Sequence, residues 1–285
     1  MNIYFDNAAT TPLRTEVISS ISEVMQECFG NPSSTHAFGR TAKTHIETAR
    51  KEIAKQINAA PQEIIFTSGG TESDNMILHC AVKDLGVKRI ISSPIEHHAV
   101  LHAMEALEQL FGISTAYVKT DDKGVVDLGD LEALLKSSKE KTLVSLMHVN
   151  NEIGNVLDLE VVGELCHQYG SYFHTDAVQG IGHFTFDMET LPVDFLSAAA
   201  HKFHGPKGIG FSFVRKNSGL QSFIHGGAQE RGLRAGTESV HNIVGMNKAL
   251  KLAYENLEVE RQKVLDVKNH FIDQITTVFP EVQFN

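Results

Sequence analysis

The segment 199–208 holds the side chain best placed for covalent chemistry, because a lysine follows an apolar run there. Lysine is rarely buried without a function. Burial lowers the pKa of its amine, and a neutral amine can form a Schiff base with a carbonyl compound. We therefore expect Lys202 to form such a bond. Lys207, in a Gly-Pro-Lys-Gly turn, is expected to be a solvated loop lysine.

An acidic side chain closes a second apolar run, Tyr172 to Asp176. An unpaired carboxylate at the end of a buried strand is costly, so Asp176 needs a cationic partner. A pyridinium nitrogen is such a partner, and an ionised Asp beside it maintains the electron sink of a pyridoxal enzyme. We expect Gln179 to reach the same ring. A helix N-cap is the alternative role of Asp176.

A glycine-rich turn, residues 68–73, follows a third apolar run. Gly69 and Gly70 in this turn allow a close approach of the backbone. Thr71 then opens a helix whose N-terminal amides would hold a phosphate. A plain glycine turn with Thr71 as the N-cap is the alternative.

Two further strand ends carry polar side chains. His97 follows one of them, in Glu-His-His, and its imidazole is placed to stack on a cofactor ring; the alternative is a surface or metal-binding histidine pair. Adjacent histidines suit one metal poorly because their side chains diverge, so we predict no metal site. Asn151 follows the other strand and is expected to donate to a phenolic oxygen or a substrate carboxylate, unless it only forms a turn.

The elements that must position these residues alternate along the chain. Apolar runs rich in β-branched residues alternate with amphipathic helices, which predicts a mostly parallel sheet between helices. The expected strands are residues 64–67, 89–92, 115–118, 143–148, 172–176, 195–198 and 209–214. The expected helices include one through Val17 to Met25 and others at 41–57, 240–256 and 260–278. Residues 279–285 are expected to begin a further unit as an unpaired strand, so we expect the chain to be truncated.

Composition narrows the class of protein. The 35 acidic and 25 basic side chains give a formal charge of -10, and no basic stripe stands out, so nucleic acid is not expected as a partner. We expect neither a signal peptide nor a membrane span, and we expect a cytoplasmic location. Cys28, Cys80 and Cys166 lack CxxC spacing, so each is expected to be a reduced thiol, in neither a disulfide nor a zinc site.

Several segments together resemble the cysteine desulfurases, which are class V aminotransferase-like enzymes that use pyridoxal 5'-phosphate. The resemblance covers essentially the whole chain. The matching segments are Asp6–Pro12, Gly30–Ser34, Gly70–Ser73, Glu96–His97, Asn150–Glu152, Asp176, Gln179, His201–Lys202 and Gly226–Thr237. The resemblance implies a fold-type I enzyme with a mostly parallel seven-stranded sheet and active sites shared across a homodimer. It also implies an N-terminal arm (1–12) that contributes to a small domain, a large cofactor-binding domain (13–258), and an incomplete small C-terminal domain (259–285).

The resemblance also implies a role for each site residue. Lys202 would be the Schiff-base lysine, with His97 stacked on the ring. Asp176 would pair with the pyridinium, and Gln179 would donate to the phenolic oxygen. The remaining implied contacts are Asn151 near the substrate, Gly70, Thr71 and His201 on the phosphate, and Thr237 on the phosphate of the partner subunit.

The implied reaction is the conversion of L-cysteine to L-alanine, with sulfur passed to an enzyme cysteine as a persulfide and then to an iron–sulfur scaffold or another acceptor. Two features depart from the family pattern. Ala199 stands where many relatives have a phosphate-binding Ser, so we expect weaker cofactor binding. The nucleophilic cysteine and the substrate-carboxylate arginine are expected beyond Asn285. The alternatives are another class V enzyme, a selenocysteine lyase or an aminotransferase, and a non-catalytic subunit that only binds the cofactor.

Overall fold

The computed structural model describes residues 3–284, and its centre is one seven-stranded sheet with the order β1-β7-β6-β5-β4-β2-β3. The strands are β1 (Ile64–Thr67), β2 (Arg89–Ser92), β3 (Ser114–Tyr117), β4 (Thr142–Ser145), β5 (Tyr172–Asp176), β6 (Phe195–Ala199) and β7 (Gly210–Val214). β7 is antiparallel to both of its neighbours, and the other pairs are parallel. The prediction of a mostly parallel seven-stranded sheet is confirmed.

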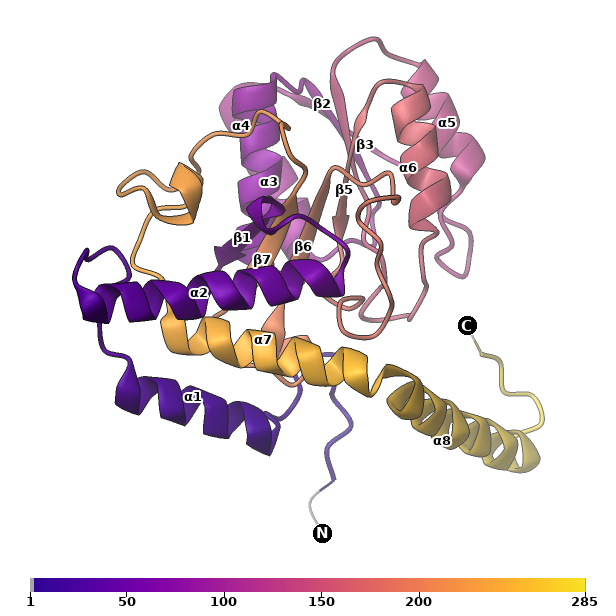
Figure 1. Ribbon diagram of the computed structural model, residues 1–285. Helices are drawn as coiled ribbons and strands as arrows, with labels where there is room; N and C mark the ends of the chain where they lie inside the picture. The colour runs from indigo at the N-terminus through magenta and orange to yellow at the C-terminus, as the bar shows by residue number, and fades with distance from the viewer. Residues whose placement is uncertain (1–2, 285) are drawn as a thin grey trace.

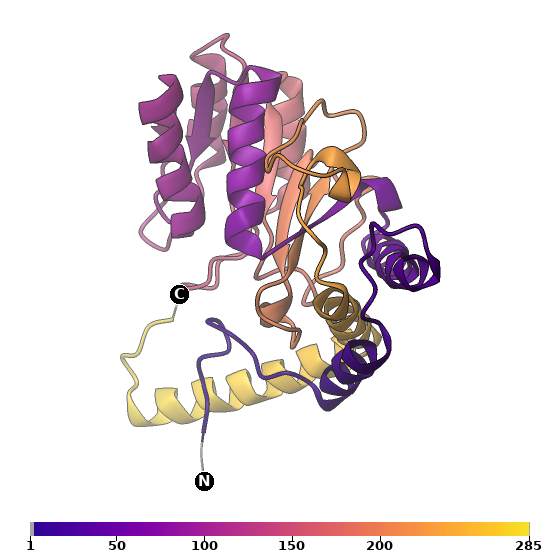
Figure 2. The ribbon, with the colours of Figure 1, turned by 90° about the vertical axis from the view of Figure 1, so that its left-hand side faces the viewer.

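Helices cover both faces of the sheet (Figures 1 and 2). They are α1 (Thr15–Glu27), α2 (Ala37–Gln56), α3 (Gly70–Leu85), α4 (His98–Phe111), α5 (Leu128–Lys136), α6 (Leu159–Gln168), α7 (Val240–Glu255) and α8 (Leu257–Val278). Side chains of α3 and α4 share one buried cluster with the strands, and side chains of α1, α2, α5, α6 and α7 share another.

Neighbouring strand residues divide between these two clusters, as the two-residue period of a strand requires. In β1, Ile64 joins the cluster of α1 and α2, whereas Ile65 joins that of α3 and α4. Phe195 and Leu196 of β6 divide in the same way. Because both faces of the sheet are buried everywhere except at the edge strand β3, most strands are rich in apolar residues, and this composition made them recognisable in the sequence.

The strand directions bring five loops to one edge of the sheet. Because β7 runs against both β1 and β6, β1 points the same way as β6 and the parallel strands. The carboxyl ends of the six strands β1–β6 therefore lie at one edge, and the loops after five of them, β1, β2, β4, β5 and β6, meet there. Ligands bind at this edge in open α/β sheets.

Several expected boundaries differ from those in the structure. Strand β4 ends at Ser145 rather than at residue 148, α8 begins at Leu257 rather than at residue 260, and the bounds of β3, β6, β7 and α7 differ by one residue. Two further differences have a clear physical cause. Helix α2 begins at Ala37 rather than at residue 41, because the His36 side chain accepts a hydrogen bond from the Gly39 N–H (3.4 Å) and caps the helix. The strand expected from residue 279 is wrong for residues 279–284. There the Val282 N–H donates to the Phe279 carbonyl (3.1 Å), which forms a turn, and no neighbouring strand offers an edge.

Helix α8 extends away from the rest of the molecule (Figures 1 and 2). None of its side chains is buried, and several large apolar ones are exposed, including Val264, Val267 and Phe271. Across residues 3–284, no helix combines the length and the apolar character needed to span a membrane.

Candidate active site

A cavity of about 430 Å³ opens at the edge where the five strands end. Its walls are Asp6, Ala8, Ala9, Gly70, Thr71, Asp74, His97, Met147, Asn151, Glu152, Asp176, Val178, Gln179, Ala199, His201 and Lys202. Eight of the nine site residues expected from the sequence are among them. The ninth, Thr237, is exposed and does not line this cavity.

Lys202 follows β6 on the short helix η2 (Ala200–Lys202), which turns its half-buried side chain into the cavity. Its Nζ donates to the carbonyls of Ala8 and, at 3.0 Å, Ala9. Burial lowers the pKa of Lys202, and this effect outweighs the opposing charges of Asp176 and Asp6. The amine is therefore easier to deprotonate than an exposed lysine, as a nucleophile or base requires.

The N-terminal segment is fixed above Lys202 by hydrogen bonds to the loop after β6. The hydroxyl and the N–H of Thr11 both donate to the His201 carbonyl, at 2.8 and 2.9 Å. The same hydroxyl accepts from the His204 N–H (2.7 Å). The Gln179 side chain donates to the Ala8 carbonyl (2.8 Å). Residues 6–9 thus form one wall of the cavity.

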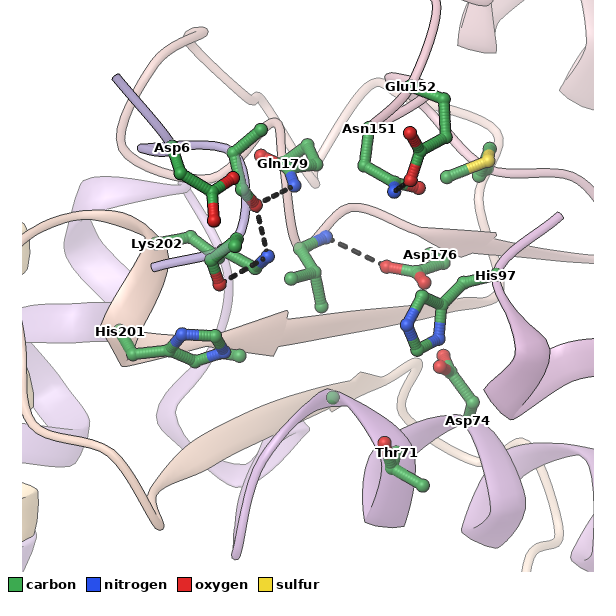
Figure 3. A pocket seen from close by; sticks show the side chains of 16 residues that line it. Asp6, Thr71, Asp74, His97, Asn151, Glu152, Asp176, Gln179, His201 and Lys202 are labelled. Carbon is green, nitrogen blue, oxygen red and sulfur yellow. Dashed lines mark hydrogen bonds between the residues drawn. The ribbon is translucent and has the colours of Figure 1, made fainter. Parts of the chain in front are cut away.

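Asp176 ends β5 and faces Lys202 across the cavity (Figure 3). Its Oδ1 accepts from the Val178 N–H at 2.9 Å, which closes a turn. No helix follows, so the alternative of a helix N-cap is wrong. Burial raises the pKa of Asp176, while the Val178 N–H and the charges of His97 and Lys202 oppose this rise.

Asp74 lies on the same side of the cavity as Asp176 (Figure 3), and we did not single it out from the sequence. It is buried, and its Oδ1 has no hydrogen-bond partner among the described residues. The signal was present, because Asp74 is four residues after Gly70 and three after Thr71 on one helix. That spacing places it on the same helix face as both.

The glycine-rich turn forms the opposite end of the cavity. Helix α3 begins at Gly70 with Gly69 as its N-cap, so the alternative of Thr71 as N-cap is wrong. A Cβ on Gly70 would lie 2.7 Å from Val178 Cγ2, so a side chain does not fit there. A hollow of about 370 Å³ continues from this end, lined also by Thr71, His201 and the exposed Lys207. Helix N-terminal amides and basic side chains suit an anion.

His97 caps α4, and its Nδ1 accepts from the Ala99 N–H (3.1 Å). Its ring lies beside Asp176 (Figure 3). Asn151 lies at the rim, where its amide donates to Glu152 Oε1 at 2.7 Å. Both residues line the cavity, and the roles predicted for them stay predictions.

Comparison with known proteins identifies the arrangement. The family model described as aminotransferase class-V matches residues 3–279. The chain belongs to this family. It is 45% identical to the cysteine desulfurase IscS of Dictyoglomus turgidum over 99% of this chain and 72% of that protein. It is 43% identical to the protein of the same name from Methanosarcina thermophila, over 99% and 70%.

Solved structures show the same fold. A NifS-like protein that is 40% identical superposes with a TM-score of 0.93, over 98% of this chain and 77% of that one. The structure of SspA in complex with cysteine is 38% identical and has a TM-score of 0.82, over 88% and 72%. These matches confirm the predicted class V, fold-type I architecture.

Pyridoxal 5'-phosphate is the cofactor of this class V enzyme family, and the cavity fits it. Lys202 and Asp176 face each other across a cavity of suitable size. Lys202 would therefore bond to the aldehyde carbon of the cofactor while Asp176 would pair with its ring nitrogen. The N-terminus of α3 and His201 border the hollow where a phosphate would lie. A glycine is needed at position 70, because any side chain there would clash with Val178.

Proposed function

We propose that this chain is the cofactor-binding body of a cysteine desulfurase, which converts L-cysteine to L-alanine and transfers the sulfur to a cysteine thiol. The observation that carries the proposal is the placement of Lys202, a half-buried amine with a lowered pKa, opposite the buried carboxylate of Asp176. Relatives at 40–45% identity are named cysteine desulfurase IscS, and a related solved structure contains cysteine.

Eight of the cavity residues have a role in this proposal. Lys202 binds the cofactor, Asp176 pairs with its ring nitrogen, and His97 stacks on its ring. Gln179 and Asn151 lie on the phenolic and substrate side. Gly70, Thr71 and His201 hold the phosphate. Bound pyridoxal phosphate supplies the electron sink that stabilises negative charge on the substrate α-carbon.

Lys202 also moves the substrate proton. With the cofactor and substrate bound, the free amine of Lys202 would take the proton from the substrate α-carbon. The lowered pKa of Lys202 makes its amine easier to deprotonate for this task. The carbonyls of Ala8 and Ala9 hold the Nζ at one side of the cavity, which limits the directions from which it approaches.

The sulfur-accepting thiol comes, in this proposal, from outside residues 3–284. Cys28, Cys80 and Cys166 do not line the cavity. Burial raises the pKa of both Cys80 and Cys166 to about 12, so neither forms a thiolate readily. The relatives named above are longer than this chain. We propose that a downstream loop carries the cysteine, and that residues 259–285 begin the small domain that bears it.

The proposal also covers the second subunit, the two domains and the sulfur acceptor. The chain forms a homodimer in which Thr237 reaches the phosphate of the other subunit. Residues 1–12 pack with the small domain, and residues 13–258 form the large one. An iron–sulfur scaffold or another acceptor takes the persulfide sulfur in the cytoplasm.

The test separates the half-reactions. The chain is loaded with pyridoxal phosphate and given L-cysteine in D₂O, and exchange at the α-carbon is followed by NMR. We expect exchange that depends on Lys202, and then alanine and sulfide when an external thiol is supplied. Formation of a 2-oxo acid instead would favour an aminotransferase.

Absence of both exchange and product would favour the non-catalytic, cofactor-binding subunit. That second candidate has one observation in its support, since no cysteine among the described residues reaches the cavity. A longer form of the protein that still gives no alanine would decide for it.

A further inference from the structure

The 226–237 loop is held in an unusual backbone conformation. Within its short helix η3 (Gln229–Gly232), both Glu230 (φ 44°) and Arg231 (φ 57°) are left-handed. Residues other than glycine rarely adopt the left-handed backbone conformation, and two successive residues in it need support from the surrounding structure. Such strain is often found where a segment must present a side chain in one place.

A buried ion pair supplies that support. Glu230 accepts from Arg50 through both carboxylate oxygens, with Oε2 and Oε1 each 2.7 Å from a guanidinium nitrogen. Oε2 also accepts from the Phe66 N–H at 2.8 Å. Both charged side chains are nearly inaccessible, and the guanidinium lies 4.4 Å from the centre of the Phe66 ring. This arrangement ties the loop to α2 and β1.

A second ion pair ties the same loop to the cavity. Arg234 donates to both oxygens of Glu72, at 2.7 and 3.1 Å. Glu72 lies in the first turn of α3, directly after Thr71, and its Oε2 accepts from the Ser68 N–H at 2.8 Å. The loop and the proposed phosphate site therefore share one rigid support.

The far end of the loop is exposed although its base is buried. Gly236 and Thr237 are exposed, and the loop stands out from the body of the molecule (Figure 1). Gln229 steadies this end, since it accepts from the Gly236 N–H (3.2 Å) and donates to Ser33 (3.3 Å). Such a rigid base under an exposed hydroxyl suits contact with a second copy of the chain.

We propose that Glu230, through its ion pair with Arg50, is a positioning residue that holds the 226–237 loop so that Thr237 completes the cofactor site of a second copy of this chain. The inference rests on the proposed function, which places Thr237 on the partner's phosphate. It adds that the side chains fixing this contact lie in the core of the donor subunit. A buried ion pair is weak support for stability by itself, so a geometric role explains its presence better.

Mixed dimers test the proposal. Glu230→Gln keeps the shape of the side chain but removes its charge. We expect the Glu230→Gln homodimer to bind pyridoxal phosphate on Lys202 roughly tenfold more weakly or worse, since a charge-assisted contact is lost. A Lys202→Ala homodimer forms no such linkage. In the mixed dimer, the Lys202 of the Glu230→Gln subunit meets an intact loop from its partner.

The mixed dimer should therefore regain wild-type affinity at one site, measured as borohydride-reducible cofactor equal to about half of the wild-type amount. The variants are co-expressed with two tags and purified on both. Thr237→Ala paired with Lys202→Ala should recover in the same way. Glu47→Gln, which removes the exposed carboxylate on the other side of Arg50 (3.2 Å), serves as the matched control and should bind as wild type.

Two results would overturn the proposal: a Glu230→Gln homodimer with wild-type affinity, or a mixed dimer without recovery, as a loop acting within its own subunit or a misfolded subunit would give. If Glu230→Gln does not fold, Arg50→Lys, which keeps the charge but not the paired contact, replaces it and must show the same recovery. If wild type forms no linkage to Lys202, the proposed function fails with this inference. If it does, only the inference is at risk.

Discussion

The Nε2 of His174 lies 3.5 Å from Oδ1 of Asp74, and both side chains are fully buried beneath the cavity. Burial lowers the pKa of His174 to about 3, so the imidazole is neutral. Its nitrogens instead contact the hydroxyls of Ser145 (2.8 Å) and Ser197 (3.1 Å). A neutral histidine cannot offset a charge on Asp74, whose pKa is raised by burial and by the Asp176 carboxylate.

The Asp74 and Asp176 carboxyls therefore carry one proton in total, and we place it on Asp74. Asp176 keeps the charge, since the Val178 N–H and the positive charge of Lys202 favour its ionised form. Two carboxyls with different surroundings thus take different protonation states. The ionised one is the one that faces Lys202 (Figure 3).

This assignment predicts opposite outcomes for two equivalent substitutions. Asp176→Asn removes one partner of a buried charge pair, which costs about 3–5 kcal/mol, so α-proton exchange should slow by roughly 10²- to 10⁴-fold. Asp74→Asn replaces a neutral acid by an amide of the same shape and should change the rate by less than about tenfold. The rates of α-proton exchange in the two variants loaded with pyridoxal phosphate test this prediction. A large loss in Asp74→Asn would show that the charge lies there.

Lys202→Ala should abolish covalent attachment of the cofactor, because Lys202 is the amine among residues 3–284 that lines the cavity. Borohydride reduction followed by peptide mass analysis measures the linkage. Lys207→Ala is the control, since Lys207 is exposed and borders only the adjoining hollow. It should keep the label on Lys202. A label that moves to Lys207 or persists in Lys202→Ala would contradict the assignment.

The sequence predicted the sheet well, because burial on both faces makes most of its strands rich in apolar residues. Strands β1, β2 and β5 have the predicted bounds. Two of the errors arose where one side chain or a missing neighbour decides the outcome. The imidazole of His36 starts α2 early, and residues 279–284 have no strand beside them.

The site was predicted wherever a residue follows a strand, since strand ends share one edge. His97, Asp176 and Lys202 were found this way. Asp74 and the walls at Asp6 and Ala8 were not, because their places depend on packing between distant segments. The cavity wall at Ala8 exists only because the N-terminal segment crosses to the loop after β6.

Ala199→Ser should tighten cofactor binding. Ala199 is buried at the cavity wall, and its Cβ would lie 3.9 Å from a Cβ on Gly70, near the proposed phosphate position. A hydroxyl donating to a phosphate contributes about 1.5–3 kcal/mol, so the Kd should fall roughly 10- to 150-fold. Titration with pyridoxal phosphate measures it. Pyridoxal without the phosphate is the control and should bind both proteins equally; an unchanged Kd for pyridoxal phosphate would refute the expectation.

Glu96 should make the protein less stable as pH rises. It is buried; its Oε1 accepts from the Ser93 hydroxyl (2.9 Å) and the Met147 N–H (3.0 Å), while Oε2 has no partner in the described part of the chain. Burial raises its pKa from 4.5 to about 8. The folded protein thus keeps a proton that the unfolded chain releases above about pH 4.5, and this contribution to stability is lost as pH rises toward 8.

Glu96→Gln cannot ionise, so its free energy of unfolding should gain on that of the wild type between about pH 5 and pH 8, by up to roughly 5 kcal/mol. Urea unfolding of both proteins across this range measures the difference. The low pKa values of His174 and of His148 (about 4) make stability rise with pH instead. This effect is the same in both proteins, so it cancels in the difference between their free energies of unfolding. Glu105→Gln, on the exposed face of α4, should show no such trend. Parallel stability curves for Glu96→Gln and wild type would mean that Glu96 is ionised in the folded protein.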